Sequence, residues 1–390
     1  MSNPGWNELV ELFAANGDLA QSCVDDGSGR TRAEAARLAF QTLLHAYPIV
    51  LHGDPAHPDW MPQLNNLYAL AAANPDTTYN FATIDGAGVY RLSGTRGSVR
   101  RVDIQSGVDM AGIHEQPGPT LETFSLDDFT IDADGRFSFL WSAQRPAGHA
   151  GDWVRLDPRA NYVMVRQIAC DWEREVDARI AIERLDAPPV RPRMGAEAIH
   201  AGLAHALQAA RRTARMFPAM LADKRARGIV NRLELNRYST MGGIPGQSYY
   251  EGLYELGADE ALIVQARVPH PDGYWSVQLF DELFVSLDWM HRLSCLNGHT
   301  AHAAADGTVQ AVVCARDPGV RNWLDVSDYP SGGVMWRWLG YPDAPAPACT
   351  RVRFDAIDAH LLPGTPRVDS DERAGQYRAR RVGAQMRRRW

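Results

Sequence analysis

Lysine is nearly missing from this chain. Lys224 is the only lysine among 390 residues, so almost every basic side chain is an arginine. A mechanism through a lysine Schiff base would have to use Lys224, whose neighbours ADKRARG predict an exposed helix end. Positive charge is not in excess either, because the net charge is −7. Proteins that bind nucleic acid normally carry a basic surface, so we expect no nucleic-acid partner.

Cysteines, long apolar runs and nucleotide motifs are also scarce. The five cysteines are scattered and form no C-x-x-C pair, which predicts free thiols and a cytoplasmic location. No apolar run approaches the roughly 20 residues that span a bilayer, and the N-terminus has no signal-peptide pattern, so we expect no membrane contact. The segment GAGVYR at 86–91 is not G-x-G-x-x-G, and neither a P-loop nor G-x-S-x-G occurs. We therefore expect no cofactor.

Helical and β-strand patterns alternate along the chain. Apolar spacing predicts helices at 7–24, 31–46 and 195–228. Short alternating runs between turn residues predict strands in two blocks, one before and one after the helix at 195–228. The predicted strands are 89–94, 98–105, 135–142 and 160–167 in the first block, and 260–268, 274–280, 308–315 and 333–339 in the second.

The two β-rich blocks repeat each other. The motif V-M-x-R occurs once in each block and ends at Arg166 and at Arg337. A tyrosine lies 87 residues before each arginine, at Tyr79 and at Tyr250. This repetition predicts a duplicated unit and an α+β, β-rich fold. We expect two β-sandwich-like lobes side by side, each with one buried face and one solvent face.

A tryptophan precedes each of these arginines. Trp153 lies 13 residues before Arg166, and Trp323 lies 14 residues before Arg337. We expect the chain to return and to place each guanidinium on the indole, which makes all four residues structural. Any chemistry would then use groups that the repeats do not share.

The predicted organisation has five parts. They are a helical N-terminal segment at 1–70, a first β-rich repeat at 71–185, a helical linker at 186–235, a second β-rich repeat at 236–362 and a basic tail at 363–390. We expect the tail to be solvated or to contact another subunit, with an anionic partner as the alternative. A homo-oligomer is left open.

Two short segments resemble known bacterial families. NPDTTY at 74–79 resembles the N-[PN]-D-T-x-Y stretch of domain-of-unknown-function family 1254, and DGT…DPGVRNWLDVS at 306–327 resembles the DGS…P…NWLP pattern of its partner, family 1214. The resemblance covers 76–185 and 245–340, and it implies a two-lobed β-rich fold without an assigned activity. This chain departs from the pattern at Asp325, where the family has proline.

The polar cluster within 74–79 has two interpretations. Asn74 and Asp76 beside Pro75 are typical of a turn in which the side chains bond their own backbone. Alternatively, Asp76 and Tyr79 line a pocket at the entrance of a strand, where binding groups often lie.

Two histidines are candidates for acid–base chemistry. His114 lies beside Glu115 in a Gly- and Pro-rich loop, and His291 begins the segment HRLSCLNGHTAH. The His and Cys spacing in that segment would suit zinc on a helix, but the internal Asn-Gly favours a loop. We therefore expect no metal.

Aromatic residues are concentrated in the second repeat. Most of them are expected in the core, and the alternative is an aromatic-lined pocket for a ring-bearing ligand. The candidates for such a pocket are Tyr249, Tyr250, Glu251, Trp289 and Trp336.

Together these features favour a cofactor-independent enzyme of lyase, hydratase or isomerase type. It would act on an apolar or aromatic small molecule in a cleft between the lobes, through acid and base side chains. The predicted catalytic residues are Asp76, Tyr79, His114, Tyr249 and His291. The predicted substrate-binding residues are Asn74, Tyr250, Glu251, Trp289 and Trp336. The alternative is a non-catalytic small-molecule-binding or assembly protein.

Overall fold

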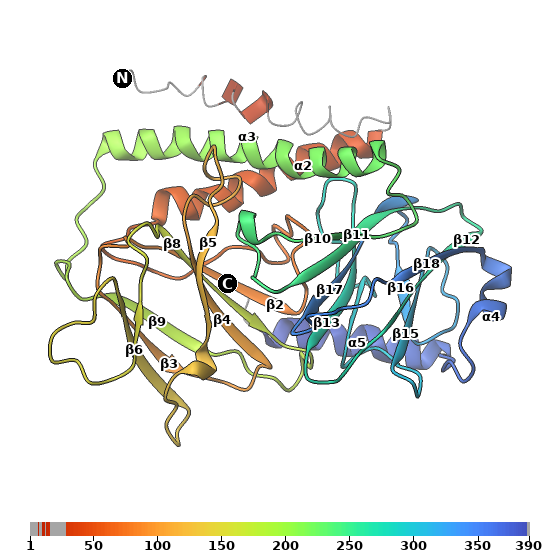
Figure 1. The fold of residues 1–390 in the computed structure, drawn as a ribbon. Coiled ribbons are helices and arrows are strands. Elements are labelled where there is room, and N and C mark those ends of the chain that lie inside the picture. Colours follow the sequence, from red (N-terminus) through yellow and green to blue (C-terminus); the bar gives the residue numbers. More distant parts are fainter. Residues whose placement is uncertain (1–6, 8–9, 12, 16–28, 388–390) are drawn as a thin grey trace.

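The computed structural model describes residues 7, 10–11, 13–15 and 29–387, so most of the helix predicted at 7–24 lies outside the described residues. Two β-rich lobes lie side by side, with α2 (Gly29–Tyr47) and α3 (Ala196–Ala226) along one side of them (Figure 1). The predicted fold is confirmed: two related β-rich lobes with helices before and between them.

The first lobe contains two sheets. The five-stranded sheet has the order β1 (Met61–Pro62), β2 (Thr77–Thr83), β8 (Tyr162–Ile168), β4 (Arg101–Gly107), β5 (Thr120–Ser125). The four-stranded sheet has the order β7 (Trp153–Arg155), β6 (Arg136–Ser142), β3 (Tyr90–Thr95), β9 (Arg179–Arg184).

The second lobe repeats this arrangement strand for strand. Its five-stranded sheet has the order β10 (Glu234–Asn236), β11 (Ser248–Glu255), β17 (Ser331–Leu339), β13 (Tyr274–Phe280), β14 (Cys295–Asn297). Its four-stranded sheet has the order β16 (Trp323–Asp325), β15 (Thr308–Cys314), β12 (Glu260–Arg267), β18 (Ala348–Arg353).

The register of the strands defines which residues are equivalent. Tyr79 pairs with Arg166 between β2 and β8, and Tyr249 pairs with Arg337 between β11 and β17. The tyrosine equivalent to Tyr79 is therefore Tyr249, one position before the residue that the spacing of 87 predicted. Both tryptophans begin a short parallel edge strand, which agrees with the duplication.

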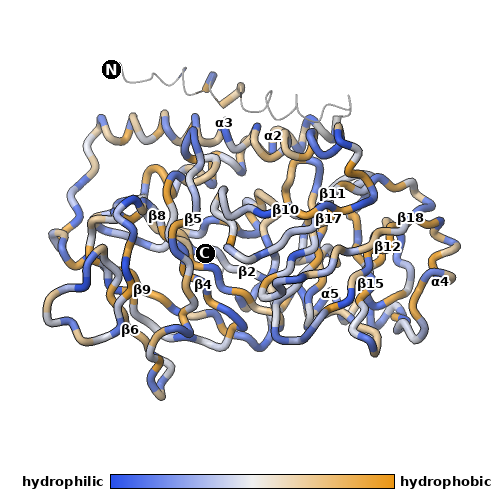
Figure 2. The backbone as a smooth tube through the Cα atoms, in the orientation of Figure 1, coloured by the Kyte–Doolittle hydropathy of each residue, from blue (hydrophilic) through white to orange (hydrophobic). Residues whose placement is uncertain are grey.

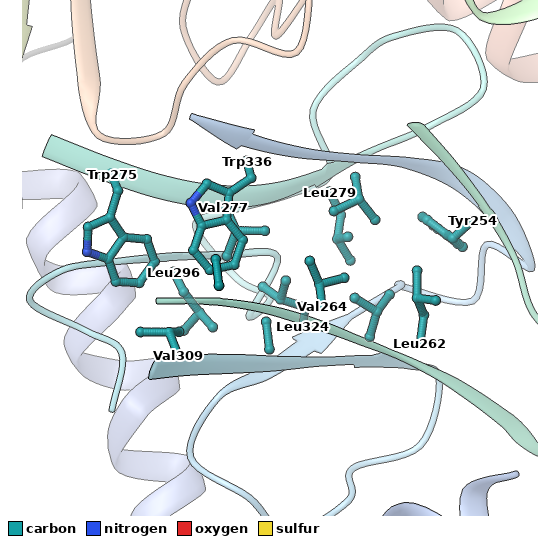
Figure 3. Packing of buried hydrophobic residues seen from close by; sticks show 14 of the residues in the cluster. Tyr254, Leu262, Val264, Trp275, Val277, Leu279, Leu296, Val309, Leu324 and Trp336 are labelled. Atoms are coloured by element: carbon teal, nitrogen blue, oxygen red, sulfur yellow. The ribbon is translucent and has the colours of Figure 1, made fainter. Parts of the chain in front are cut away.

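Each lobe is a sandwich whose core lies between its two sheets. Figure 3 shows this core in the second lobe, where Trp275 and Trp336 of the five-stranded sheet point toward Val264 and Val309 of the other sheet. The core of the first lobe is built in the same way and includes Val163 of β8. Side chains alternate between the two faces of a strand, so the neighbours of these core residues point outward.

The outward faces of the five-stranded sheets are not open to solvent, contrary to the expectation. All seven residues of β8 and eight of the nine in β17 are buried. The outward residues of β8 and β17, such as Met164 and Met335, lie at the boundary between the lobes, where they line one cavity. Polar outward residues therefore do not indicate contact with water in this protein, because the second lobe covers them.

The predicted stacking of arginine on tryptophan is wrong. Trp153 and Arg166 lie in different sheets of the first lobe, and the same is true of Trp323 and Arg337 in the second. The guanidinium over the Trp323 ring belongs instead to Arg373, at 5.1 Å from the ring centroid. The sequence spacing could not distinguish a return within one sheet from a crossing to the other.

The helix α3 confirms the helical linker and covers both lobes. Its buried face includes Ala206, Ala209, Ala210 and Thr213, at the spacing of an amphipathic helix. Figure 2 shows hydrophobic and hydrophilic residues alternating along α3. Lys224 near its end is buried, not exposed as predicted, and its ammonium lies 2.9 Å from carboxylate oxygens of two glutamates. The α2 helix, expected at 31–46, contacts α3 and is followed by a π-helical turn at Pro48–His52.

The basic C-terminal segment forms the helix α5 (Ser370–Met386) rather than a solvated tail. Some of its arginines bind within the chain. Arg373 pairs with Asp317 at 2.8 Å, and Arg387, just after the helix, pairs with Asp177 of the first lobe at 2.6 Å. The remaining helical elements are short: η2 (Leu126–Asp128), η3 (Ser239–Met241), η4 (Phe354–Ala356) and α4 (Ile357–His360).

Replacing Trp323 with alanine is expected to lower the free energy of unfolding by about 3 kcal/mol, because the indole is buried between the β16 edge and Arg373. Trp153→Ala is the matched control, since Trp153 is only half-buried and should lose less. Chemical denaturation of both variants measures the difference. An equal loss in both would show that the contact between Trp323 and helix α5 adds nothing to stability.

Candidate functional site

A cavity of about 160 Å³ lies between the two lobes and is bounded by α2 and α3. Much of its wall is apolar: Leu64, Leu70, Met110, Met164, Ile168, Phe217, Met220, Ile244, Phe284 and Met335. Polar side chains reach it from both lobes and from the helices: His45, Gln63, Asn74, Tyr79, Arg166, Thr213, Tyr238, Tyr249 and Arg337. An apolar wall with a few polar groups is typical of a small-molecule site.

Each lobe contributes the same three side chains to this cavity. They are Tyr79, Met164 and Arg166 from the first lobe, and Tyr249, Met335 and Arg337 from the second. The strand alternation explains the set, because the valines between them in β8 point into the sandwich core. In each lobe the guanidinium carbon lies 5.9 Å from the centroid of the tyrosine ring.

The two arginines also hold the opposite lobe. Arg166 donates a hydrogen bond of 2.7 Å to the carbonyl of Gly242 in the second lobe. Arg337 donates in the same way to the carbonyl of Ala72 in the first lobe. Both carbonyls lie seven positions before the cavity tyrosine of their own lobe, and both residues have left-handed φ, 85° for Gly242 and 46° for Ala72. For Ala72 that conformation is strained, and the arginine contact helps to hold it.

A glutamine orients each guanidinium. The side-chain oxygen of Gln105 accepts from Arg166 at 2.7 Å, and that of Gln278 accepts from Arg337 at 2.6 Å. Both glutamines also donate to the same loop carbonyl as their arginine. The guanidiniums are therefore fixed by neutral partners within the protein.

The charges of the two arginines are buried without a carboxylate beside them. Arg166 is 9% exposed and Arg337 is 3% exposed. Within the described part of the chain, neither guanidinium forms an ion pair within 4.0 Å. Asp103 lies opposite Arg166 in the sheet, but it pairs with Arg101 at 2.7 Å. Buried charges are normally paired, so this cavity wall favours an anionic group.

Three polar side chains from outside the sheets complete the wall. Among the residues that the structure describes, both ring nitrogens of His45 lack a hydrogen-bond partner, as do the side-chain oxygens of Gln63 and Thr213. All three side chains are buried. Burial lowers the pKa of His45 to about 4, so its imidazole is neutral near physiological pH.

Two tyrosines of the cavity, Tyr238 and Tyr249, remain protonated at neutral pH because burial raises the pKa of each hydroxyl. Burial raises the pKa of Tyr249 to about 12, while the charges of Arg337 and Arg166 oppose this rise. The neighbouring Tyr238 donates its hydroxyl to Glu251, a buried carboxylate that also pairs with Lys224. Tyr249 can therefore donate a hydrogen bond or a proton to a ligand, but it is a poor base.

Asp76 lies beside the cavity as the centre of a polar network that joins the lobes. Its carboxylate accepts hydrogen bonds from Trp172 at 2.9 Å, from Tyr274 at 2.7 Å and from Asn297 at 2.7 Å. Burial raises the pKa of Asp76, and the three donors oppose the rise. The backbone carbonyl of Asp76 also accepts from Arg387 at 2.7 Å.

The structure brings together three of the predicted site residues. Asn74, Tyr79 and Tyr249 line the cavity, and Asp76 lies beside it. The side chain of Asn74 accepts from the backbone of Asp76 at 3.1 Å, so the segment forms the expected turn as well as part of the cavity wall.

The two predicted histidines lie apart from the cavity. His114 is half-buried in a loop that packs on α3, with its ring 3.8 Å from Asp109. His291 is exposed on a turn and contacts Asp288 at 2.9 Å. Nothing in the geometry places either one on the wall of this cavity.

The remaining predicted residues lie in the interior of the protein. Tyr250 points into the sandwich of the second lobe, where Trp336 is fully buried. Trp289 packs in a separate cluster with residues of α2. Glu251 is fully buried behind the cavity, in the network with Tyr238 described above.

Sequence reasoning missed His45 and assigned Arg166 and Arg337 to the scaffold. The signal for the arginines was present in V-M-x-R, because a charged residue alternates there with core valines or a tryptophan. Such a residue must face the other side of the strand, and two equivalent ones suggest one shared site. His45 carried no such signal within its helical run.

Metal and membrane sites are not found in the described residues. No three His, Cys, Asp or Glu side chains there are grouped as a metal site would require. None of the helices in the same residues is long and apolar enough to cross a bilayer. Among the described cysteines, Cys170, Cys314 and Cys349 are free thiols.

The fold and the cavity between the lobes define a two-lobed protein built from a duplicated β-sandwich, and the chain is similar to solved structures to different degrees. An uncharacterised protein from Burkholderia cenocepacia is 30% identical, with 90% of this chain and 97% of that chain covered and a TM-score of 0.83. The VPA0106 protein from Vibrio parahaemolyticus is 17% identical, with 87% of this chain and 100% of that chain covered and a TM-score of 0.46. No curated protein matches the chain.

The chain belongs to the same family as the Burkholderia protein. Residues 257–341, within the second lobe, match the model of the protein family of unknown function DUF1214. The resemblance of the second repeat to family 1214 is thereby confirmed.

Proposed function

We propose that this protein is a cofactor-independent enzyme that acts on an apolar or aromatic small molecule in the cavity between the lobes. The reaction is of lyase, hydratase or isomerase type, in which one side chain removes a proton and another delivers one. The single observation that carries this proposal is His45, a neutral imidazole on the wall of a largely apolar cavity, whose two nitrogens have no hydrogen-bond partner in the described part of the chain.

His45 is the proposed base. A buried polar group without a hydrogen bond is unfavourable by about 1–3 kcal/mol, so its retention at this position favours a role toward a ligand. Its lowered pKa keeps the ring neutral and able to accept a proton. A negative charge on a bound substrate would raise that pKa toward neutrality and make His45 a stronger base.

Tyr79 and Tyr249 are the proposed proton donors. Each lies against a guanidinium, which stabilises the phenolate that forms when the proton leaves. The raised pKa of Tyr249 keeps its proton in place until a basic atom of the substrate approaches. His45 comes from α2 and the tyrosines come from the two sheets, so the cavity can present the base and the acids to different parts of one molecule.

The test uses purified wild-type protein and an extract of small metabolites. Untargeted mass spectrometry should detect a compound that is consumed together with one that appears. His45→Gln should slow this conversion by about 100-fold or more, because acid–base catalysis typically contributes that factor. His291→Gln is the matched control and should convert the compound at the wild-type rate, since His291 is exposed away from the cavity.

Two results would contradict the proposal. One is a His45→Gln variant that is as active as the wild type. The other is retention of a metabolite by the cavity without any conversion, which would instead support the non-catalytic binding protein.

We also propose that the first lobe is related to family 1254 and that the protein is cytoplasmic. The NPDTTY stretch at 74–79, which begins the cavity wall, supports a relationship of the first lobe to family 1254. The free thiols of Cys170, Cys314 and Cys349 support a reducing, cytoplasmic environment.

A further inference from the structure

We infer that the molecule bound in the cavity carries a carboxylate, which Arg166 and Arg337 hold between the two lobes. This inference rests on the proposed use of the cavity as a small-molecule site, and it names the chemical class of the ligand. It does not depend on whether the ligand is converted.

The two guanidiniums have hydrogen-bonding capacity to spare. Arg166 uses two N–H groups, one toward Gln105 and one toward Gly242. Arg337 likewise bonds Gln278 and Ala72. A guanidinium carries more N–H groups than these two, and its planar fork matches the two oxygens of a carboxylate.

The arginines are held in place before any ligand binds. Both partners of each guanidinium are neutral acceptors on the protein, so these bonds fix its orientation without cancelling its charge. The charges of both guanidiniums oppose the rise in the pKa of the Tyr249 hydroxyl. The two charges and this phenol therefore lie in one region of the cavity. A preorganised cluster of donors binds an anion without first reorganising.

The charge balance favours a monoanion. Asp103 faces Arg166 across the sheet and already interacts with its charge, although at a distance beyond a close ion pair. Among the described residues, no carboxylate is similarly opposite Arg337, whose strand neighbours are Tyr249 and Ser276. Asp103 is shared with Arg101, so it offsets only part of the charge of Arg166, and the uncompensated charge of the two guanidiniums falls short of two. A carboxylate brings one negative charge and stays within this limit, whereas a phosphate monoester brings nearly two.

The rest of the ligand is apolar. Side chains of Phe217, Met220 and Phe284 line the cavity beyond the two sheets. Methionine and aromatic side chains adapt to apolar groups of varied shape. The expected ligand is thus a small aromatic or aliphatic carboxylic acid.

The first experiment compares matched probes on the wild-type protein by isothermal titration calorimetry. Benzoate, phenylacetate and hexanoate are compared with benzyl alcohol and hexanol, which have similar apolar parts and no charge. Phenyl phosphate is included as the dianionic probe. At least one carboxylate is expected to bind about 30-fold or more tightly than its alcohol, because a buried charge-assisted contact contributes that much.

The second experiment locates the contact with variants. Arg337→Gln is expected to weaken the best carboxylate by about 30-fold or more, while the alcohol changes little. Arg373→Gln is the matched control, because Arg373 is equally buried but pairs with Asp317 outside the cavity. The wild-type comparison of probes keeps the inference testable if the Arg337 variant does not fold.

The outcomes separate this inference from the proposed function. Tight carboxylate binding without any conversion would support the inference and contradict the enzyme. Conversion of a neutral compound, with no preference for carboxylates, would support the enzyme and contradict the inference. The inference is overturned if no carboxylate binds, if the alcohols bind as tightly, if phenyl phosphate binds most tightly, or if Arg337→Gln binds carboxylates like the wild type.

Discussion

His45→Gln is expected to gain about 3 kcal/mol of stability relative to the wild type as the pH falls from about 7 to about 4. In the folded protein the pKa of His45 is lowered from 6.5 to about 4 by burial. Between these two values the unfolded chain binds a proton that the folded chain does not, so wild-type stability falls with falling pH. Glutamine does not titrate, and the variant lacks this loss.

Asp281 is expected to give the opposite dependence of stability on pH, over an overlapping pH range. Burial raises the pKa of Asp281 from 3.8 to about 7, while its carboxylate accepts two backbone hydrogen bonds of 2.9 Å. The folded chain binds the extra proton in this case, so its stabilising contribution is present at low pH and is lost as the pH rises toward 7. Asp281→Asn should therefore gain about 3 kcal/mol relative to the wild type as the pH rises from about 4 to about 7.

Urea denaturation at a series of pH values measures both effects. The two groups change the stability in opposite directions as the pH changes. The free energy of unfolding of the wild type should therefore depend less on pH than that of either single variant. The double variant His45→Gln with Asp281→Asn is the control and should again be flatter than the single variants. The stability of each variant relative to the wild type should change with pH in opposite directions for the two variants. If neither changes with pH, or if both change in the same direction, these side chains are not buried as the structure places them.

Replacing Asp76 with alanine is expected to lower the free energy of unfolding by about 4 kcal/mol. The change leaves the donors of Trp172, Tyr274 and Asn297 without their shared acceptor inside the protein. Asn297 can still donate to a backbone carbonyl at 3.1 Å, which keeps the effect from being larger.

Asp76→Asn is the matched control for this prediction. Its oxygen can accept the bonds of Trp172 and Asn297, and its amide can donate to Tyr274, whose hydroxyl also lies 3.2 Å from Asn74. The expected loss is about 1–2 kcal/mol, because one buried hydrogen bond changes direction and none is removed. Calorimetric unfolding measures both variants. Equal losses would mean that the charge of Asp76, and not its acceptor capacity, holds the network.

The duplication makes one site out of two half-sites. Each repeat supplies a tyrosine, a methionine and an arginine to the same cavity, and each arginine holds a loop of the other repeat. The groups that the repeats share therefore lie at the centre of the candidate site, while the unshared His45 comes from a helix outside both sheets. From the sequence we expected any chemistry to use only residues that the repeats do not share. Our proposal instead combines the shared tyrosines and arginines with the unshared His45.

Much of the fold could be predicted from the sequence, because strand periodicity and turn residues are local properties. The alternation of V-M-x-R, the turns at Asp134-Gly135 and Asp306-Gly307, and the alanine-rich run of α3 act within a few residues. Each of the strands predicted in the two blocks is present. The repeated spacing also revealed the duplication, to within one position at Tyr249.

Only the tertiary structure decided which residues of one lobe contact which residues of the other. Arg166 and Gly242 are 76 residues apart, and Arg337 and Ala72 are 265 residues apart. A polar residue on the outer face of a strand is typical of a solvent-exposed position, and only the second lobe turns that face into a buried cavity. The chain by itself determined two similar β-rich units and their outward-facing arginines. The packing of the lobes and of α2 on each other decided that these arginines, the tyrosines and His45 share one enclosed space.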